Sequence, residues 1–103
     1  MNFAVAGFDW DAGNREKCGR HGVALTEIEF ALSGEIRVSP DLRHSDHEAR
    51  YIAVGVNTKG RPVFVAFTFR IVDGARRLRP ISARYMHARE IDRYDPPRSR
   101  PRH

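Results

Sequence analysis

The chain has 103 residues, of which 41% are hydrophobic and 30% are charged, and its formal net charge is +5. This length supports one compact domain, and the composition is that of a globular protein rather than a disordered chain. No apolar stretch approaches the roughly 20 residues of a membrane-spanning helix, and the N-terminus lacks the features of a secretory signal. We therefore expect a cytoplasmic protein with no membrane partner, in which the single cysteine, Cys18, is consistent with a reducing compartment.

Two helices are predicted in the N-terminal third. Asp11 is suited to cap the first helix and Gly22 to end it. The second helix is expected to have Thr26 as its cap and to carry an apolar stripe at the i, i+3, i+4 spacing, formed by Ile28, Ala31 and Leu32.

From Ile36 the pattern changes to strands separated by turns. About four strands are predicted, over the segments "IRVSP", "RYIAVGVN", "PVFVAFTFRIV" and "RLRPISAR". The turns between the last three are short enough to join antiparallel neighbours. The stretch from Val63 to Phe67 is apolar throughout, which predicts a central strand with both faces covered. Pro80 cannot donate to a ladder, so the last strand is expected at an edge or at a bulge.

The segment "YMHAREIDRY" predicts a closing helix of about ten residues. The expected architecture is therefore α+β, with two N-terminal helices, an antiparallel sheet of about four strands and a short C-terminal helix. We expect one domain over residues 1–94, followed by a basic, disordered tail over residues 95–103.

The positive charge is concentrated at the C-terminal end. Residues 76–103 contain nine arginines and three acidic residues, a net charge of +6, whereas residues 1–75 carry a net charge of −1. Arginine binds phosphate through a planar, bidentate fork, so a phosphate-bearing partner is the first interpretation. A solvated surface with a basic tail that pairs with an acidic protein is the alternative.

Two groups of polar residues are candidates for a phosphate site. On the first predicted helix, Lys17, Arg20 and His21 have the spacing of one face and can form a phosphate platform or an ordinary solvated face. The junction after the last strand is denser, since Ser82 and Arg84 alternate onto one side of the strand and a histidine and a carboxylate follow on the helix.

Arg84 can neutralise a phosphate whose charge grows in a transition state, whereas His87 and Glu90 can transfer protons. The alternative is that His87 and Glu90 form only a local pair on the helix, while Tyr94 packs on the sheet.

Other constellations are weaker. The segment "HSDHE" (residues 44–48) has no zinc-ligand spacing, and no glycine-rich loop for nucleotide phosphates is present, so neither a metal nor a cofactor is expected. Cys18 lies near Lys17 and His21, which can lower the pKa of its thiol, but a buried structural cysteine is the favoured interpretation.

Three segments resemble, in order, the signatures of BrnT-type toxins, small proteins of bacterial type II toxin–antitoxin modules. These segments are "FDWDAGNREKCGRHGV" (residues 8–23), "HEARYIAVG" (47–55) and "RPISARYMHAREI" (79–91). The resemblance implies a RelE-like α+β ribonuclease fold and toxicity through RNA cleavage and loss of translation. It also implies a cognate antitoxin, usually a DNA-binding ribbon-helix-helix protein, that covers the toxin and represses the shared operon. Operator DNA is then a partner only through the antitoxin, in a complex that can contain a toxin homodimer.

The resemblance also identifies candidate residues. The matching positions are Trp10 and Asp11, Lys17, Arg20, His21 and Gly22, Arg50 and Tyr51, and Ser82, Ala83, Arg84 and Glu90. Ala49 stands where the family has glutamate, and Pro80 stands where an ordinary strand residue is usual. We expect three catalytic residues, Arg84, His87 and Glu90. We expect RNA phosphates to contact Lys17, Arg20, His21, Arg50, Tyr51, Ser82 and Tyr85.

Such a site supports a metal-independent reaction. The 2′-hydroxyl of one nucleotide attacks the adjacent phosphate, with a base, an acid and a cation that neutralises the phosphate. DNA is excluded as a substrate because it lacks this nucleophile. Two alternatives remain open, a non-catalytic module that binds nucleic acid or an acidic partner, and a decayed toxin retained for operon control.

Overall fold

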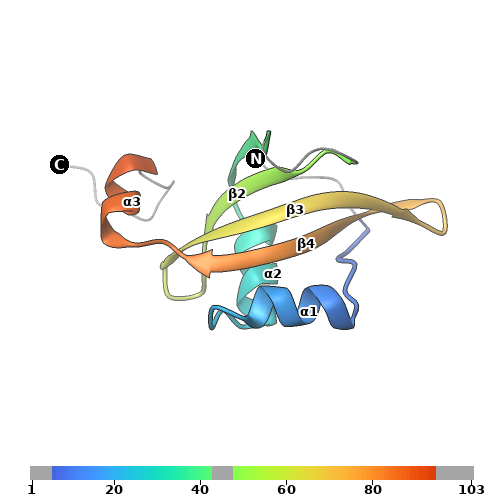
Figure 1. Ribbon diagram of the computed structural model, residues 1–103, viewed down its shortest axis with the longest axis horizontal. Coiled ribbons are helices and arrows are strands. Elements are labelled where there is room, and N and C mark those ends of the chain that lie inside the picture. The colour runs from blue at the N-terminus through green and yellow to red at the C-terminus, as the bar shows by residue number, and fades with distance from the viewer. Residues whose placement is uncertain (1–5, 43–47, 95–103) are drawn as a thin grey trace.

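The computed structural model describes residues 6–42 and 48–94, and the order of its elements confirms the predicted α+β class (Figure 1). Helices α1 (Ala12–Gly19) and α2 (Leu25–Ser33) precede the sheet, and α3 (Ala88–Tyr94) follows it. The antiparallel sheet has the order β1-β2-β3-β4, with strands β1 (Arg37–Pro40), β2 (Tyr51–Val56), β3 (Pro62–Val72) and β4 (Ala75–Tyr85). No helix in the described part of the chain is long and apolar enough to cross a membrane. The predicted tail over residues 95–103 lies outside the described residues.

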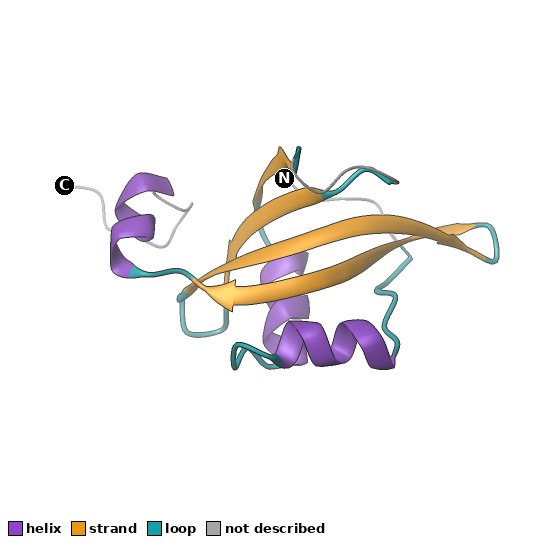
Figure 2. Cartoon of the chain, viewed as in Figure 1, coloured by secondary structure: helices purple, strands orange, loops and turns teal. Residues whose placement is uncertain are grey.

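Helices α1 and α2 cover one face of the sheet (Figure 2). Cys18 of α1 and Ile28 of α2 are fully buried in one core with Val63, Val65 and Phe67, which alternate along β3. Burial of this apolar surface is the main stabilising contribution to the fold. Strand β3 lies between β2 and β4, so the prediction of a central strand is confirmed. The prediction that both of its faces are covered is wrong, because Phe64 and Ala66 are only partly buried and line an open pocket.

Gly55 sets how closely α2 approaches the sheet. A Cβ atom at this position of β2 would lie 2.7 Å from the carbonyl oxygen of Ala31 and 3.0 Å from Cγ2 of Ile36. Only glycine therefore fits without moving the helix backbone.

Asp11 caps α1 as predicted. Its Oδ1 accepts a hydrogen bond from the backbone N–H of Asn14 at 3.0 Å, and Asn14 Oδ1 accepts one from the backbone N–H of Asp11 at 2.7 Å. The predicted end at Gly22 is wrong, because the helix stops at Gly19 and the chain leaves through a turn in which Gly22 has φ +84°.

The predicted cap of α2 is also wrong. The helix begins at Leu25 after Ala24, no side chain caps it, and Thr26 lies inside the first turn. The first turn is instead tied to the β2–β3 loop, because the Glu27 carboxylate accepts hydrogen bonds from Thr58 N–H at 2.9 Å and Thr58 Oγ1 at 2.6 Å. The bonds from Thr58, led by its hydroxyl, lower the pKa of Glu27.

Strands β3 and β4 form a long hairpin whose tip projects past α1 (Figure 1). Asp73 and Gly74 form its two-residue turn with φ of +52° and +78°, the left-handed pair that suits the twist of a hairpin. On the outer side of β4, residues 6–9 run parallel to the strand, with Ala6 N–H donating to Arg76 O and Asp9 N–H to Leu78 O.

A β-bulge interrupts β4 at Ile81. Phe67 of β3 pairs with Pro80, and the preceding Ala66 pairs with Ser82, so Ile81 has no partner in the ladder. Before the bulge the even-numbered residues, including Pro80, face the helices, and after it the odd-numbered residues do. The extra residue therefore turns Ser82 and Arg84 to the open face, where strict alternation would have aimed them into the core. The expectation of an edge or bulge at Pro80 is thus confirmed, since this strand has both.

Helix α3 is shorter than the predicted ten residues. Tyr85 still pairs with Val63 in the sheet, and the helix starts at Ala88, where His87 O accepts the backbone N–H groups of Glu90 and Ile91. Buried Met86 joins the strand to the helix, which lies beyond the strand ends (Figure 1).

Candidate functional site

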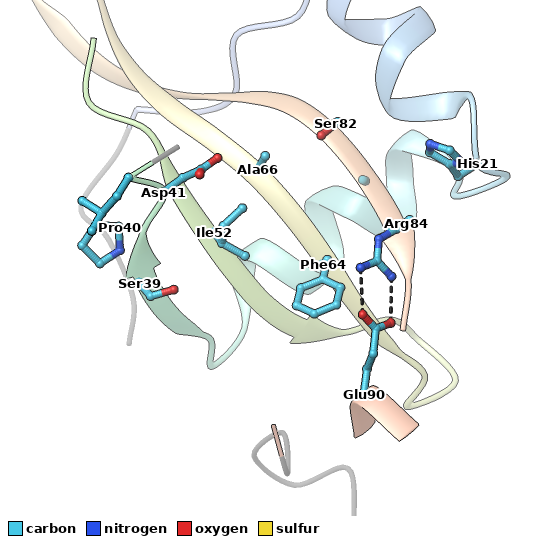
Figure 3. A pocket seen from close by; sticks show the side chains of 12 residues that line it. His21, Ser39, Pro40, Asp41, Ile52, Phe64, Ala66, Ser82, Arg84 and Glu90 are labelled. Atoms are coloured by element: carbon cyan, nitrogen blue, oxygen red, sulfur yellow. Dashed lines mark hydrogen bonds and ion pairs between the residues drawn. The ribbon is translucent and has the colours of Figure 1, made fainter. Parts of the chain in front are cut away.

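An open pocket of about 730 Å³ lies on the sheet face that α1 and α2 leave uncovered (Figure 3). Its floor is formed by Ile52 of β2 and by Phe64 and Ala66 of β3. Polar side chains reach it from separate segments, namely His21, Ser39, Asp41, Ser82, Arg84 and Glu90. Four of the predicted site residues therefore meet in one pocket: His21, Ser82, Arg84 and Glu90.

Arg84 and Glu90 form the central contact of the pocket, and Figure 3 shows the two side chains facing each other. The guanidinium Nη1 and Nη2 donate to Oε1 and Oε2 of Glu90, each at 2.8 Å, which is the bidentate geometry of an arginine and a carboxylate. The Arg84 side chain remains 41% exposed, so the contact lies at an accessible site.

Glu90 is held in its ionised form. The hydrogen bonds from Arg84, with one from the backbone N–H of His87 at 2.9 Å, lower its pKa to about 2. A carboxylate with so low a pKa is a weak base near neutral pH. In this geometry Glu90 therefore orients Arg84 and caps the start of α3.

Phe64 supports Arg84 from below. The guanidinium carbon lies 4.5 Å from the centre of the Phe64 ring, within the range of a cation–π contact. Together with Glu90, this ring fixes the direction of the guanidinium fork, which is what preorganised stabilisation of an anion requires.

His21 lines the same pocket from the loop between α1 and α2, and Figure 3 shows its side chain beside the outer edge of β4. The predicted platform on one helical face is wrong, because α1 ends at Gly19 and the three basic side chains separate. Lys17 lines a second groove, and Arg20 pairs on the surface with Glu16 at 3.1 Å.

The remaining predicted residues lie outside this pocket. Arg50 lines the second groove with Lys17. Tyr51 stacks on Phe67 with ring centres 5.5 Å apart and packs against the core.

Tyr85 and His87 flank the pocket without lining it. The Tyr85 ring lies 3.8 Å from the guanidinium carbon of Arg61, and its hydroxyl accepts a hydrogen bond from Asn57 Nδ2 at 3.4 Å. His87 is exposed at the start of α3. Its role in proton transfer stays a prediction.

Sequence reasoning missed several residues of the pocket, among them Ser39, Asp41 and Phe64. Asp41 comes from the loop after β1, and its backbone N–H donates to Arg50 O at 2.8 Å, which brings the loop beside β2. Phe64 was assigned only to the core, although its place opposite Arg84 in the ladder follows from pairing the two strands. No local sequence signal identifies Asp41.

Two further sequence interpretations concern Cys18 and metals. Cys18 is buried as favoured, and burial raises the pKa of its thiol to about 11, so a reactive thiolate is not formed. Among residues 6–42 and 48–94, no three histidine, cysteine or acidic side chains are grouped as metal ligands. The histidines of the "HSDHE" segment lie outside the described residues.

The fold and the pocket define a small α+β protein with an arginine-centred pocket on the open face of its sheet. A family described as "Ribonuclease toxin, BrnT, of type II toxin-antitoxin system" matches residues 10–90. The chain belongs to this family, and the resemblance seen in its three signatures is confirmed. Membership implies a toxin with an antitoxin partner. No curated protein matches the chain.

Proposed function

We propose that this protein is an endoribonuclease toxin that cleaves RNA without a metal ion, by attack of a 2′-hydroxyl on the adjacent phosphate. The observation that carries the proposal is the oriented Arg84 fork in an open pocket, in a chain of the BrnT ribonuclease toxin family. Cleavage of RNA in the cytoplasm would stop translation and growth. We also propose that the fold is related to that of RelE-type toxins.

Arg84 binds the scissile phosphate in this proposal. Its guanidinium has more N–H donors than the contact with Glu90 uses, so it can contact the phosphate while Glu90 holds it, and a fixed guanidinium favours the transition state, in which the phosphate carries more negative charge. Glu90 holds the fork in place, and Ser82 lies on the same side of β4 as a further phosphate contact. The sequence also indicates Glu90 as a proton-transfer group, but its low pKa favours the orienting role.

His21 is the stronger candidate for proton transfer. It lines the same pocket as Arg84, whereas His87 is exposed outside the described lining. An imidazole populates both protonation states near neutral pH, as a base for the 2′-hydroxyl or an acid for the leaving oxygen requires.

The antitoxin would inhibit the toxin by covering this pocket. A ribbon-helix-helix antitoxin would also carry the complex to operator DNA, and a toxin homodimer within the complex belongs to the same proposal. The toxin itself would contact RNA alone, since DNA lacks the nucleophile.

The proposal is tested by replacing Arg84 in purified protein and in cells. We expect Arg84→Ala to reduce RNA cleavage at least ~10²-fold, by analogy with loss of one transition-state donor, and to remove growth inhibition. Arg15→Ala, which removes an exposed arginine from α1, is the matched control and should cleave normally.

Substitution of the two histidines separates their roles. We expect His21→Asn to lower kcat by about 10²- to 10⁴-fold with a small change in KM, and His87→Asn to have less effect. Cleavage should persist in a metal chelator and stop when the substrate carries 2′-deoxy sugars. If wild-type protein degrades no RNA with or without ribosomes and does not slow growth, the protein is a non-catalytic binding or operon-control module.

A further inference from the structure

A second groove, of about 580 Å³, lies beside the Arg84 pocket along β4. Cationic side chains from four separate segments line it, namely Lys17 of α1, Arg50 before β2, Arg70 of β3 and Arg79 of β4. Two carboxylates, Asp11 and Glu48, also line it. These four cations come from distant parts of the chain and are brought together by the fold. The groove therefore differs from a row of basic residues on the exposed face of a single helix or strand.

Arg79 forms a fixed wall of the groove. Its side chain is only 16% exposed and donates to Asp9 Oδ2 at 3.1 Å and to Asp11 Oδ2 at 2.7 Å. These two carboxylates compensate its charge, so Arg79 shapes the groove more than it attracts an anion.

The positive charge accessible to a ligand comes from Lys17 and Arg70. Arg70 Nε lies 4.0 Å from Glu48 Oε2, at the outer limit of an ion pair, and the two side chains are 49% and 40% exposed. Such a solvated pair stabilises little, so a phosphate can take the place of the carboxylate at Arg70. Lys17 is also exposed at the rim.

The groove and the pocket adjoin each other at two points. Ile81 lines the groove and the next residue, Ser82, lines the pocket. On the opposite side, Asp41 of the pocket donates its N–H to the carbonyl of Arg50 of the groove at 2.8 Å. A ligand that fills both must therefore be extended and must carry negative charge at intervals.

We propose that this groove binds a second phosphate of the same RNA strand, further along the strand from the phosphate held by Arg84. The inference rests on the proposed function and adds a substrate requirement to it. A single RNA strand carries one phosphate per nucleotide, and four ladder positions separate Arg79 from Arg84, roughly 13 Å along the strand. A dinucleotide has one internal phosphodiester and can occupy only one of the two sites, so the toxin prefers longer single strands.

The experiment measures binding of uncleavable RNA. The probes are a 2′-O-methylated single strand of about eight nucleotides and the corresponding dinucleotide, titrated against the full chain over a range of salt concentrations. The test variant combines Lys17→Gln with Arg70→Gln, and the control combines Arg15→Gln with Lys59→Gln. Both pairs remove two exposed positive charges, but the control residues line neither the pocket nor the groove.

We expect the wild-type protein to bind the longer strand at least about tenfold more tightly than the dinucleotide. The test variant should lose most of this preference, and its slope of log K against log salt should fall by about 1.4, the value for two phosphate contacts on a single strand. The control variant should keep the preference and the slope.

If the test and control variants lose the same amount of affinity for the longer strand, the overall charge of the protein alone explains the binding, and the inference is overturned. Tight binding of polyglutamate that depends on Lys17 and Arg70 in the same way would also overturn it, in favour of an acidic protein partner. Because the probes cannot be cleaved, the binding experiment can confirm the second phosphate site even if the protein has no ribonuclease activity. If the protein cleaves RNA but binds both probes equally well, the second phosphate site is refuted and the proposed ribonuclease function is not.

Discussion

Arg84 is accessible but held in one direction by a carboxylate and an aromatic ring. Few exposed arginines are held in this way, since a free side chain of this length has many rotamers. The residue thus combines the accessibility needed to admit a ligand with the order needed to bind a phosphate in a defined geometry.

Cys18 differs from a reactive cysteine in both burial and pKa. Because its pKa is raised to about 11, only a very small fraction is thiolate at pH 8, and the folded core shields the sulfur. We predict that a thiol-specific reagent labels native protein slowly at pH 8 and labels protein in denaturant rapidly. Rapid labelling of the folded protein would contradict the burial of this side chain.

Any residue larger than glycine at position 55 should lower the stability of the fold. We predict that Gly55→Ala lowers the free energy of unfolding by about 1–3 kcal/mol, because the new methyl group meets the Ala31 carbonyl of α2. Denaturant unfolding measures the change. Gly19→Ala is the control, since no atom lies within 4 Å of the added Cβ, and it should leave the stability unchanged or slightly raised. Equal effects of the two substitutions would argue against the close helix–sheet contact.

At the scale of elements, α3 is attached to the sheet through the Arg84–Glu90 contact and the short link at Met86. The folded pKa of Glu90, about 2, is below its ordinary value of 4.5, so the ionised form favours the attached helix. The stabilising effect is therefore complete above pH about 4.5 and is lost as the pH falls through about 2.

The backbone N–H of His87 reports this transition, because it donates to Glu90 Oε1. We predict that its amide chemical shift changes between pH 4.5 and 2 with a midpoint near 2, and that Glu90→Gln removes the transition. A midpoint near 4.5 in the wild-type protein would show that the ion pair does not form in solution.

The bulge in β4 explains why the site could be predicted only in part. The alternation of Ser82 and Arg84 and the order of helices and strands depend on local periodicity, which the sequence shows directly. Which face receives Arg84 depends on the unpaired Ile81, and this follows only from the register against β3. Pro80 indicated a disturbance of the ladder but not its consequence for the side chains.

The N-terminal candidates were misplaced for a similar reason. Lys17 and His21 share a helical face only if the helix continues to Gly22. Because the helix stops at Gly19, Lys17 lines the groove and His21 lines the pocket. Asp41 lies far from Arg84 in the sequence, and only the tertiary fold brings both to one pocket. Helix ends and long-range neighbours are therefore the features that local patterns predict least well.

At the scale of the whole molecule, the protein has one covered and one open sheet face. The covered face holds the core, the open face holds the pocket, and the groove is lined by residues of both α1 and β4. Stability and recognition thus depend on different side chains of the same strands. Substitutions on the open face can alter the proposed RNA binding while the core keeps the fold intact.

The buried side chain of Asn14 has a consequence for the order in which the protein is made. Its Nδ2 donates to the carbonyl of Pro80 at 2.8 Å, across 66 positions of sequence. Because a chain is synthesised from its N-terminus, this hydrogen bond between α1 and β4 can form only after β4 has been synthesised. Arg84 and Glu90 leave the ribosome later than Pro80. A ribosome-bound fragment that ends before β4 therefore lacks the Arg84 pocket, and any activity of this pocket begins only when synthesis of the chain is nearly complete.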